Sequence, residues 1–459
     1  MKKRIIVIGA GASGMMAAGR AAEVGAEVTL LEKMELPGKK ILISGKTRCN
    51  LTNARELDDF ILMYGANGRF LYSAFHRFFR DELLSFFQRY GVVTKVERGG
   101  RIFPASDDAS DIVRALEQYL SDVGVHLQTH TQVEHIVTRN RQVTGVQTEK
   151  GFIPADAVIL AAGGASFPET GSTGDGYRLA AEMGHTIVKL RPALVPLAVY
   201  ESTRAQRMQG VTLENVRLTA YQCPADAIPE TRPPIPDSGR GIPGRKPRLP
   251  IIASRLGDMM MTHFGIGGPV TLILSLAVVE TLEKGPVSVA IDFKPGLTHE
   301  ELRQRLQRDM QRYGKRSYRH ILAGLLPHKV VDIFVEMTGV PADKIGSSIT
   351  VEERERLLQL LKSFRFNIKG PLPMSSAMVT AGGVALKEII PQTMASRLVE
   401  GLYFCGEVID IDADTGGYNL QAAFSTGYVA GEAAGQKTYM PNSLRSSTST
   451  LKGRPTTLE

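Results

Sequence analysis

Three glycines near the start of the chain have the spacing that binding of a pyrophosphate requires. Gly9, Gly11 and Gly14 lie in the run Gly9-Ala10-Gly11-Ala12-Ser13-Gly14, between an apolar segment and an alanine-rich one. The first glycine permits a tight turn, the second lets the backbone approach the anion, and the third lets a helix pack on a strand. The free amides of that helix would face the pyrophosphate. The alternative is a glycine-rich turn without a function.

Glu32 supplies the second half of this pattern. It follows the apolar segment Ala26–Leu31, where a carboxylate accepts hydrogen bonds from the hydroxyls of an adenosine ribose. An acid at this position repels a 2′-phosphate. The sequence therefore predicts a site for FAD or NAD rather than NADP.

The segment from Pro37 to Asn53 favours FAD over NAD. It contains cations, hydroxyls and amides directly after the ribose-binding strand, which is unusual for a nicotinamide dehydrogenase. Such a segment can follow the pyrophosphate and ribityl chain toward a flavin ring. The alternative is a polar surface loop.

Two side chains are candidates for proton transfer. Flavin N5 delivers a hydride, and reduction of a carbon–carbon double bond also needs a proton donor. Cys49 stands between Arg48 and Asn50, where nearby cations could adjust its acidity, although it could equally be a packing residue. His263 is the second candidate, and a lone histidine is more often structural. The three cysteines are widely spaced, so we expect neither a disulfide framework nor a metal site.

The elements that position these residues indicate an α/β, Rossmann-like fold. A strand at Arg4–Ile8, a helix at Met15–Val24 and a strand at Ala26–Leu31 form a βαβ unit. A buried strand at 157–162 ends in Gly163-Gly164. The pattern also predicts helices over 69–90, 111–123, 300–313, 351–364 and 420–434, and a hairpin within 133–146.

The pattern of predicted secondary structure changes after residue 190. We expect a β-rich domain over 191–297 with a proline-rich loop at 228–250, a helical subdomain over 298–369, a return to the first domain over 370–435, and a flexible tail over 436–459. The first domain would then comprise residues 1–190 and 370–435.

The net charge of +8 is concentrated in the middle of the chain. Residues 191–370 contain 26 Lys and Arg against 18 Asp and Glu. This surplus suits a polyanionic partner, and it could equally be a solvated face that aids solubility. The cations most suited to an RNA phosphate backbone are Arg240, Arg245, Lys246, Arg248, Arg303, Arg305, Arg308 and Arg312.

One N-terminal window has the appearance of an export signal. Ile5–Ala22 is apolar and follows a basic start, but its glycines and its change from strand to helix pattern are typical of a nucleotide-binding fold. We therefore expect no membrane span and a cytoplasmic location.

Four segments carry a resemblance to a known family. They are residues 38–53, AAGGASFPETGSTGDGYRLAAEMGH from Ala161, MMTHFGIGGPV from Met260, and GEVIDIDADTGGYNLQAAFSTGYVAG from Gly406. Together they resemble the BaiN/RdsA-type NAD(P)/FAD-dependent flavoproteins. More distantly, Thr173-Gly174-Asp175-Gly176, which follows the Gly-Gly strand end, is similar to the flavoprotein subunits of fumarate reductases and succinate dehydrogenases. The family more often has Gly-Gly-Gly where this chain has Gly45-Lys46-Thr47, so two positions at which glycine would allow any backbone conformation have gained side chains.

The resemblance implies a GR2-type FAD domain in two segments, with the inserted β-rich domain on the substrate side. It also implies that FAD lies along a defined set of residues, namely Gly9, Gly11, Ser13, Gly14, Glu32, Lys33, Lys40, Arg48, Cys49, Asn50, Leu51, Val133, Gly163, Gly406, Glu407, Asp410, Gly417, Tyr418, Asn419 and Leu420. No second glycine fingerprint follows a strand, so NAD(P)H would be a transient electron donor, unless the electrons come from another donor.

Three activities remain open. The resemblance implies reduction of a carbon–carbon double bond, such as conversion of uridine to dihydrouridine in 23S ribosomal RNA. Other relatives suggest a small-molecule enzyme, either a reductase of 3-oxo bile acids or enones, or an aminoacetone oxidase. The third hypothesis is a non-catalytic flavin-binding redox sensor.

Overall fold

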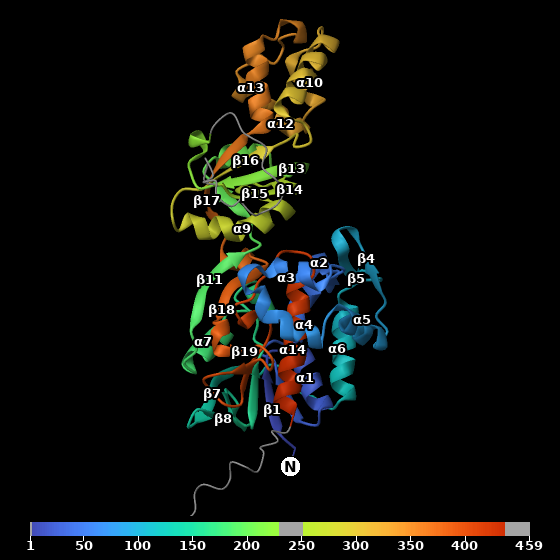
Figure 1. Ribbon diagram of the computed structural model, residues 1–459, viewed down its shortest axis with the longest axis vertical. Coiled ribbons are helices and arrows are strands. Elements are labelled where there is room, and N and C mark those ends of the chain that lie inside the picture. The colour runs from blue at the N-terminus through green and yellow to red at the C-terminus, as the bar shows by residue number, and fades with distance from the viewer. Residues whose placement is uncertain (1, 229–250, 437–459) are drawn as a thin grey trace, which may run out of the picture.

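The molecule consists of two bodies joined by a narrow connection (Figure 1). The computed structural model describes residues 2–228 and 251–436. The first body contains both ends of this described chain, and the second consists of a β-barrel with a helical subdomain on its far side (Figure 1). The proline-rich segment and the expected tail lie outside the described residues, apart from Ile228 and Gln436.

A seven-stranded sheet forms the centre of the first domain, in the order β19-β20-β21-β10-β1-β2-β6. The neighbours from β21 to β6 are all parallel, and Val7 of β1 is in register with Ile159 of β10 and Leu30 of β2. Both faces of this sheet are buried, which explains its continuous apolar strands. Its strands are β1 (Arg4–Ile8), β2 (Glu27–Leu31), β6 (His126–Gln128), β10 (Ala157–Leu160), β19 (Ile389–Ile390), β20 (Ala395–Ser396) and β21 (Leu402–Phe404).

Helices α1 (Ala12–Glu23) and α14 (Tyr418–Gly435) pack closely although they lie at opposite ends of the sequence. A Cβ atom on Gly427, Gly431 or Gly435 would collide with the backbone of α1. This spacing of four residues puts the three glycines on one side of α14. The C-terminal segment therefore completes the domain that the N-terminus begins.

Shorter elements surround this sheet. The predicted helix over 69–90 is two helices, because Phe78 has an extended backbone between α4 and α5. The remaining helices of this domain are α2 (Lys39–Thr47), α3 (Leu57–Ile61), α4 (Tyr72–Arg77), α5 (Arg80–Arg89), α6 (Ser110–Asp122) and α7 (Asp175–Glu182). Two three-stranded sheets contain β3 (Thr52–Asn53), β4 (Thr94–Val96) and β5 (Arg101–Pro104), and β7 (Val133–Arg139), β8 (Gln142–Thr148) and β9 (Gly151–Pro154).

Two antiparallel strands connect the bodies, β11 (Ile187–Ala193) and β18 (Val379–Val384). Beyond them a closed six-stranded barrel forms the inserted domain, in the order β12-β15-β14-β13-β16-β17. Its strands are β12 (Leu197–Val199), β13 (Thr212–Tyr221), β14 (Ile251–Met261), β15 (Gly265–Gly267), β16 (Ser288–Asp292) and β17 (Phe364–Pro371).

The inserted segment also contains two helices that the sequence pattern did not predict, α8 (Ser202–Arg207) and α9 (Pro269–Leu282). Helix α9 lies on the side of the barrel that faces the first domain (Figure 1). Apolar residues occupy most of its positions, so no helical period distinguishes it from a buried strand.

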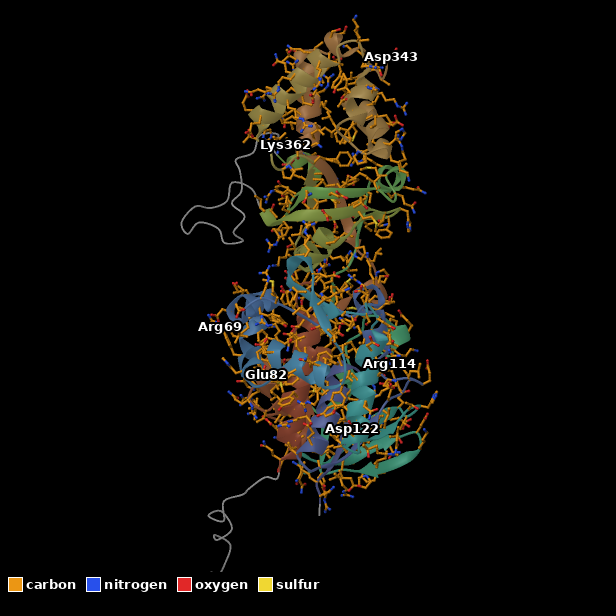
Figure 2. All side chains as sticks on the ribbon, turned by 90° about the vertical axis from the view of Figure 1, so that its right-hand side faces the viewer. Arg69, Glu82, Arg114, Asp122, Asp343 and Lys362 are labelled. Atoms are coloured by element: carbon orange, nitrogen blue, oxygen red, sulfur yellow. The ribbon has the colours of Figure 1, made fainter. Side chains whose placement is uncertain are left out.

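The helical subdomain caps the opposite end of the barrel. It contains α10 (His299–Arg312), α11 (Tyr318–Ala323), α12 (His328–Thr338) and α13 (Val351–Lys362). Helix α10 begins with a capping box in which Thr298 and Glu301 satisfy each other's backbone amides, and α13 begins in the same way. The side view in Figure 2 shows Asp343 at the outer tip of this subdomain, far from Arg114 and Asp122 on α6.

No helix within residues 2–228 and 251–436 is long and apolar enough to cross a membrane. The window Ile5–Ala22, which has the appearance of an export signal, forms β1 and most of α1.

Candidate functional site

A cavity of about 1050 Å³ runs from the carboxyl ends of β1 and β2 to the barrel. One end is lined by the glycine turn and Glu32, and the other by residues of β14, β15 and α9. Ligands of open parallel sheets bind beyond the carboxyl ends of the strands. The cavity therefore occupies the position that the βαβ unit predicts and continues into the inserted domain.

The glycine turn forms the first wall. Gly9 has φ +100°, and a Cβ atom there would lie 2.7 Å from the carbonyl oxygen of Ala161, directly after the neighbouring strand β10. Apart from its chain neighbours, no described residue has an atom within 4 Å of the place where a Gly11 Cβ atom would stand, so the Gly11 backbone is open to the cavity. Gly14 does not line the cavity, because it packs against the Gly9 carbonyl.

Backbone amides hold the Glu32 carboxylate at this end of the cavity. Its two oxygens accept hydrogen bonds from the amides of Ala10, at 2.7 Å, and Met34, at 2.9 Å. Each carboxylate oxygen retains a further acceptor position. Glu32 can therefore accept a ribose hydroxyl without rearrangement.

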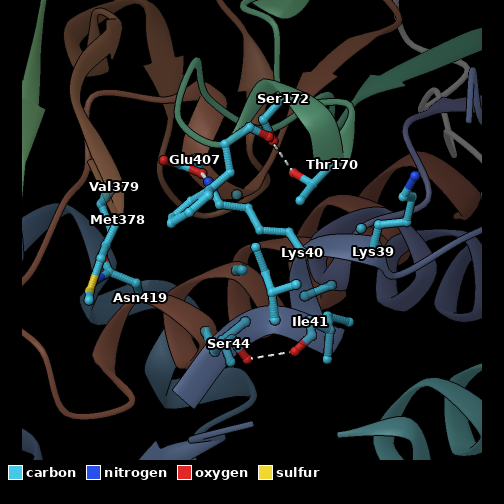
Figure 3. Close-up of a pocket in the computed structure, with 18 of the residues that line it drawn as sticks. Lys39, Lys40, Ile41, Ser44, Thr170, Ser172, Met378, Val379, Glu407 and Asn419 are labelled. Carbon is cyan, nitrogen blue, oxygen red and sulfur yellow. Dashed lines mark hydrogen bonds and ion pairs between the residues drawn. The ribbon is translucent and has the colours of Figure 1, made fainter. Parts of the chain in front are cut away.

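Two lysines lie along the cavity in ion pairs. Lys33 Nζ is 2.5 Å from Asp175 Oδ2, and Lys40 Nζ is 2.7 Å from Glu407 Oε2. Figure 3 shows Lys40 and Glu407 meeting across the cavity from α2 and from the segment after β21. Glu407 Oε1 also accepts a hydrogen bond from the amide of Thr380 at 2.8 Å. The Lys40–Glu407 ion pair therefore joins three segments of the first domain.

The polar segment after Pro37 begins with a helix and continues as a turn. Residues from Lys39 form a helix, and the backbone leaves it at Ser44. Gly45, Lys46 and Thr47 then have φ values of 58°, 59° and 65°. The left-handed conformation that glycine favours is thus kept where this chain has Lys46 and Thr47.

Cys49 and His263 lie off the cavity surface. Cys49 is fully buried, and burial raises the pKa of its thiol to about 12, so the nearby cations do not make it acidic. His263 is exposed on the turn between β14 and β15, where its ring packs edge-on against Phe264 at 4.9 Å. Of the two interpretations of Cys49, this position favours packing.

Most of the residues expected along FAD line this one cavity. Those that line it are Gly9, Gly11, Ser13, Glu32, Lys33, Lys40, Arg48, Asn50, Val133, Gly163, Gly406, Glu407, Gly417, Asn419 and Leu420. Gly14, Cys49, Leu51, Asp410 and Tyr418 do not. Asp410 instead accepts a hydrogen bond from Asn67, and the Tyr418 ring packs on Phe60.

The sequence did not identify the residues at the barrel end of the cavity. This end is mainly apolar, and its lining includes Leu194, Met259, Met260, Leu272, Met378, Thr262, Arg101 and Phe103. The only signal for this set was the resemblance of the segment that begins at Met260. Four separate stretches of chain contribute these residues, so no local pattern could have grouped them.

The predicted RNA-binding cations are dispersed. Arg240, Arg245, Lys246 and Arg248 lie outside the described residues. On α10, Arg303 is paired with Glu300 and Glu355, and Arg305 lies 3.7 Å from Asp309. Arg308 and Arg312 are exposed. In the described part of the chain no group of His, Cys, Asp or Glu could hold a metal ion.

A family model described as the HI0933-like protein Rossmann domain matches residues 3–433. The chain belongs to this family. The resemblance inferred from the four segments is thereby confirmed, as is the Rossmann-like fold class.

Relatives in the HI0933-like family match along nearly their whole length. The chain is 33% identical over 437 residues to the 3-dehydro-bile acid delta(4,6)-reductase of Clostridium scindens, covering 95% of this chain and 99% of that one. It is 30% identical to the ribosomal RNA dihydrouridine synthase of Haemophilus influenzae, covering 92% and 96%. A 3-ketosteroid delta1-dehydrogenase from Sterolibacterium denitrificans has a similar fold, with 13% identity, a TM-score of 0.48, and coverage of 95% of this chain and 100% of that one.

The chain is an FAD-dependent oxidoreductase, as its family and this site together indicate. The cavity fits the cofactor: it has an open backbone at Gly11, a held carboxylate at Glu32 and a buried Asn50 Oδ1 that has no hydrogen-bond partner among residues 2–228 and 251–436. A buried polar atom usually has a partner, so Asn50 is suited to a ligand donor.

Proposed function

We propose that this protein reduces a carbon–carbon double bond conjugated to a carbonyl group, with NAD(P)H as the electron source. The observation that supports this proposal is the continuous cavity, which joins the dinucleotide cradle to an apolar chamber in the inserted domain. When bound, FAD supplies hydride transfer. Double bonds of this kind occur both in uridine and in small enones.

The chain's own residues hold and shield the reactants. Glu32 would hold the adenosine ribose, and Lys40 with Glu407 would orient the cofactor between α2 and β18. Met259, Met260 and Leu272 would exclude water from the reacting bond. NAD(P)H would enter the same cavity transiently, because no second dinucleotide fingerprint is present in the sequence.

The first candidate substrate is uridine in 23S ribosomal RNA. Its support is a basic surface at the end of α10, formed by exposed Arg308, Arg312, Lys315 and Arg316, none of which is paired with a carboxylate in residues 2–228 and 251–436. Such cations bind nucleic-acid phosphates irrespective of sequence. Two relatives are also named as ribosomal RNA dihydrouridine synthases. Under this proposal the protein acts in the cytoplasm.

The second candidate is an apolar enone, such as a 3-oxo steroid or bile acid. Its support is the chamber wall, in which Met260 and Met378 are 42% and 45% exposed and line the cavity. Methionine side chains adapt to large apolar ligands. Neither an aminoacetone oxidase nor a redox sensor would need an apolar chamber of this kind.

Mapping of ribosomal RNA separates the two candidates. We expect a strain without this gene to lose one dihydrouridine from its 23S RNA by mass spectrometry, and the purified holoenzyme with NADPH to restore it. An unchanged nucleoside profile would eliminate the RNA candidate. Turnover of 3-oxo-4-ene steroids that is insensitive to salt would then favour the enone candidate.

A further inference from the structure

Six cationic side chains line the cavity, and four of them are neutralised. Lys33, Lys39, Lys40 and Arg48 form ion pairs with Asp175, Glu35, Glu407 and Glu97, at 2.5, 3.0, 2.7 and 2.9 Å. Lys46 and Arg101 have no carboxylate partner anywhere in the described ranges 2–228 and 251–436. Two uncompensated positive charges therefore remain on the cavity wall.

Arg101 and the turn that carries Lys46 both lie against one aromatic ring, that of Phe103. Arg101 and Phe103 are alternate residues of β5, so both side chains project from the same face of that strand. The Arg101 guanidinium is 5.9 Å from the centre of the Phe103 ring, and Arg48 covers the same ring at 4.1 Å. A Cβ atom on Gly45 would lie 3.3 Å from this ring, which brings the Gly45-Lys46 turn against it.

Both cations are free to meet a ligand. The only hydrogen bond from the Arg101 side chain to another described residue goes from Nε to the Arg98 carbonyl at 3.1 Å, so both terminal nitrogens stay available. Lys46 is exposed and makes no side-chain hydrogen bond within the described part of the chain. It keeps φ at 59°, where a side chain is disfavoured.

We propose that Lys46 and Arg101 form a phosphate-binding subsite for the reduced nicotinamide dinucleotide that donates electrons. The forked guanidinium binds phosphate oxygens in pairs, and the lysine adds a point charge. Two free positive charges match a pyrophosphate or a 2′-phosphomonoester better than a single carboxylate. This inference rests on the proposed electron donor and names where that donor is held.

Arg101→Met and Lys46→Met test the subsite in the holoenzyme, where bound FAD occupies the cradle at Gly11. Each substitution removes a charge and keeps an apolar stem. Arg98→Met is the matched control, because Arg98 is exposed beside β5 and does not line the cavity. Arg101→Lys restores the charge without the fork.

Calorimetric titration with inorganic pyrophosphate measures the subsite without turnover. We expect Arg101→Met to weaken pyrophosphate binding about tenfold or more, as loss of a charge-assisted contact does. Lys46→Met should weaken it in the same direction, Arg101→Lys should recover part of it, and Arg98→Met should have no effect. Equal affinities in wild type, Arg101→Met and Arg98→Met would overturn the proposal.

Anaerobic stopped-flow reduction of the flavin identifies the source of the phosphate. We expect Arg101→Met to raise the half-saturating NADPH concentration about tenfold while the limiting rate stays unchanged. This pattern is expected when the lost contact stabilises the bound dinucleotide equally in the ground state and in the transition state. If the half-saturating concentration of NADH rises by the same factor, the subsite binds the pyrophosphate. If only that of NADPH rises, the subsite binds the 2′-phosphate. Either result supports the proposal.

Two outcomes of the kinetic experiment contradict the assignment to the donor. One is an effect confined to the oxidative half-reaction with RNA or an enone, which would assign the subsite to the substrate. The other is a wild-type flavin that neither NADPH nor NADH reduces. That result would contradict the proposed electron donor itself, and pyrophosphate titration would still report whether the two cations bind phosphate.

Discussion

Glu32 shows how one side chain can be prepared for a ligand before the ligand binds. Two backbone amides orient its carboxylate at the end of β2, so little side-chain entropy remains to be lost on binding. The same amides would be left facing a positive charge if an arginine replaced it. The position is therefore sensitive to charge reversal.

We expect Glu32→Arg to abolish retention of FAD. The arginine cannot accept a hydrogen bond from a ribose hydroxyl or from the Ala10 amide. The visible absorbance of the purified protein, compared with its absorbance at 280 nm, measures occupancy. Glu32→Gln, which keeps an acceptor oxygen, should retain part of the flavin, and full yellow occupancy of Glu32→Arg would disprove the assigned ribose contact.

Thr47 carries local strain. It is β-branched and has φ at 65°, a conformation that such residues rarely adopt, and the Ala109 amide holds its carbonyl at 2.9 Å. We expect Thr47→Gly to stabilise the folded state by about 1 kcal/mol, because the relief of strain exceeds the added flexibility of the unfolded chain.

Thermal unfolding of the holoprotein measures this effect as a rise in Tm. Thr47→Ala is the control, because alanine keeps a Cβ atom in the left-handed region and should gain less. A lower Tm for Thr47→Gly would show that the threonine side chain itself stabilises the turn.

At the scale of elements, the segment between β21 and α14 concentrates negative charge beside the connection of the two bodies. Burial, Asp410, Glu280, Asp414 and Glu407 together raise the pKa of Asp412 to about 7. An acid whose pKa is raised by folding stabilises the folded state only while it is protonated. Stability should therefore fall as the pH rises from about 4 toward 7.

We expect Asp412→Asn to stabilise the protein more at pH 8 than at pH 5, with a difference on the order of 2 kcal/mol. The amide mimics the protonated acid at every pH, so the penalty for ionisation disappears. Denaturant unfolding at the two pH values measures the difference. The control is Asp59→Asn, on the exposed side of α3, which should change the stability equally at pH 5 and pH 8. A gain from Asp412→Asn that is the same at both pH values would contradict the link between ionisation of Asp412 and folding.

Elements with a local signal could be predicted from the sequence. The βαβ unit was recognisable because Gly9, Gly11, Gly14 and Glu32 each meet a requirement of their own backbone position. Helix α9 was not, because its apolar residues follow no period and its place is decided by packing on distant strands, chiefly β14 of the barrel and the connecting strand β11. The burial of Cys49 was equally hidden, since the residues that cover it come from several distant segments.

At the scale of the whole molecule, the cavity exists because two bodies face each other across β11 and β18. The first domain contributes the cofactor cradle, and the barrel contributes the apolar wall. The helical subdomain lies beyond the barrel and does not line the cavity. Its basic surface can therefore influence binding of a large substrate without touching the reacting centre.

This separation gives a prediction for the RNA candidate. We expect Arg308→Glu combined with Arg312→Glu to lower the rate of dihydrouridine formation at limiting RNA by at least about tenfold, and to reduce the dependence of that rate on salt. Reduction of the flavin by NADPH should stay at its wild-type rate, because α10 does not contact the cavity.

Arg89→Glu combined with Arg98→Glu, at two exposed cations of the first domain, makes the same change of net charge and should leave RNA turnover unaffected. Equal losses in the two double variants would mean that net charge, rather than the surface on α10, attracts the RNA. No loss in either would remove the structural support for an RNA substrate and favour the apolar enone.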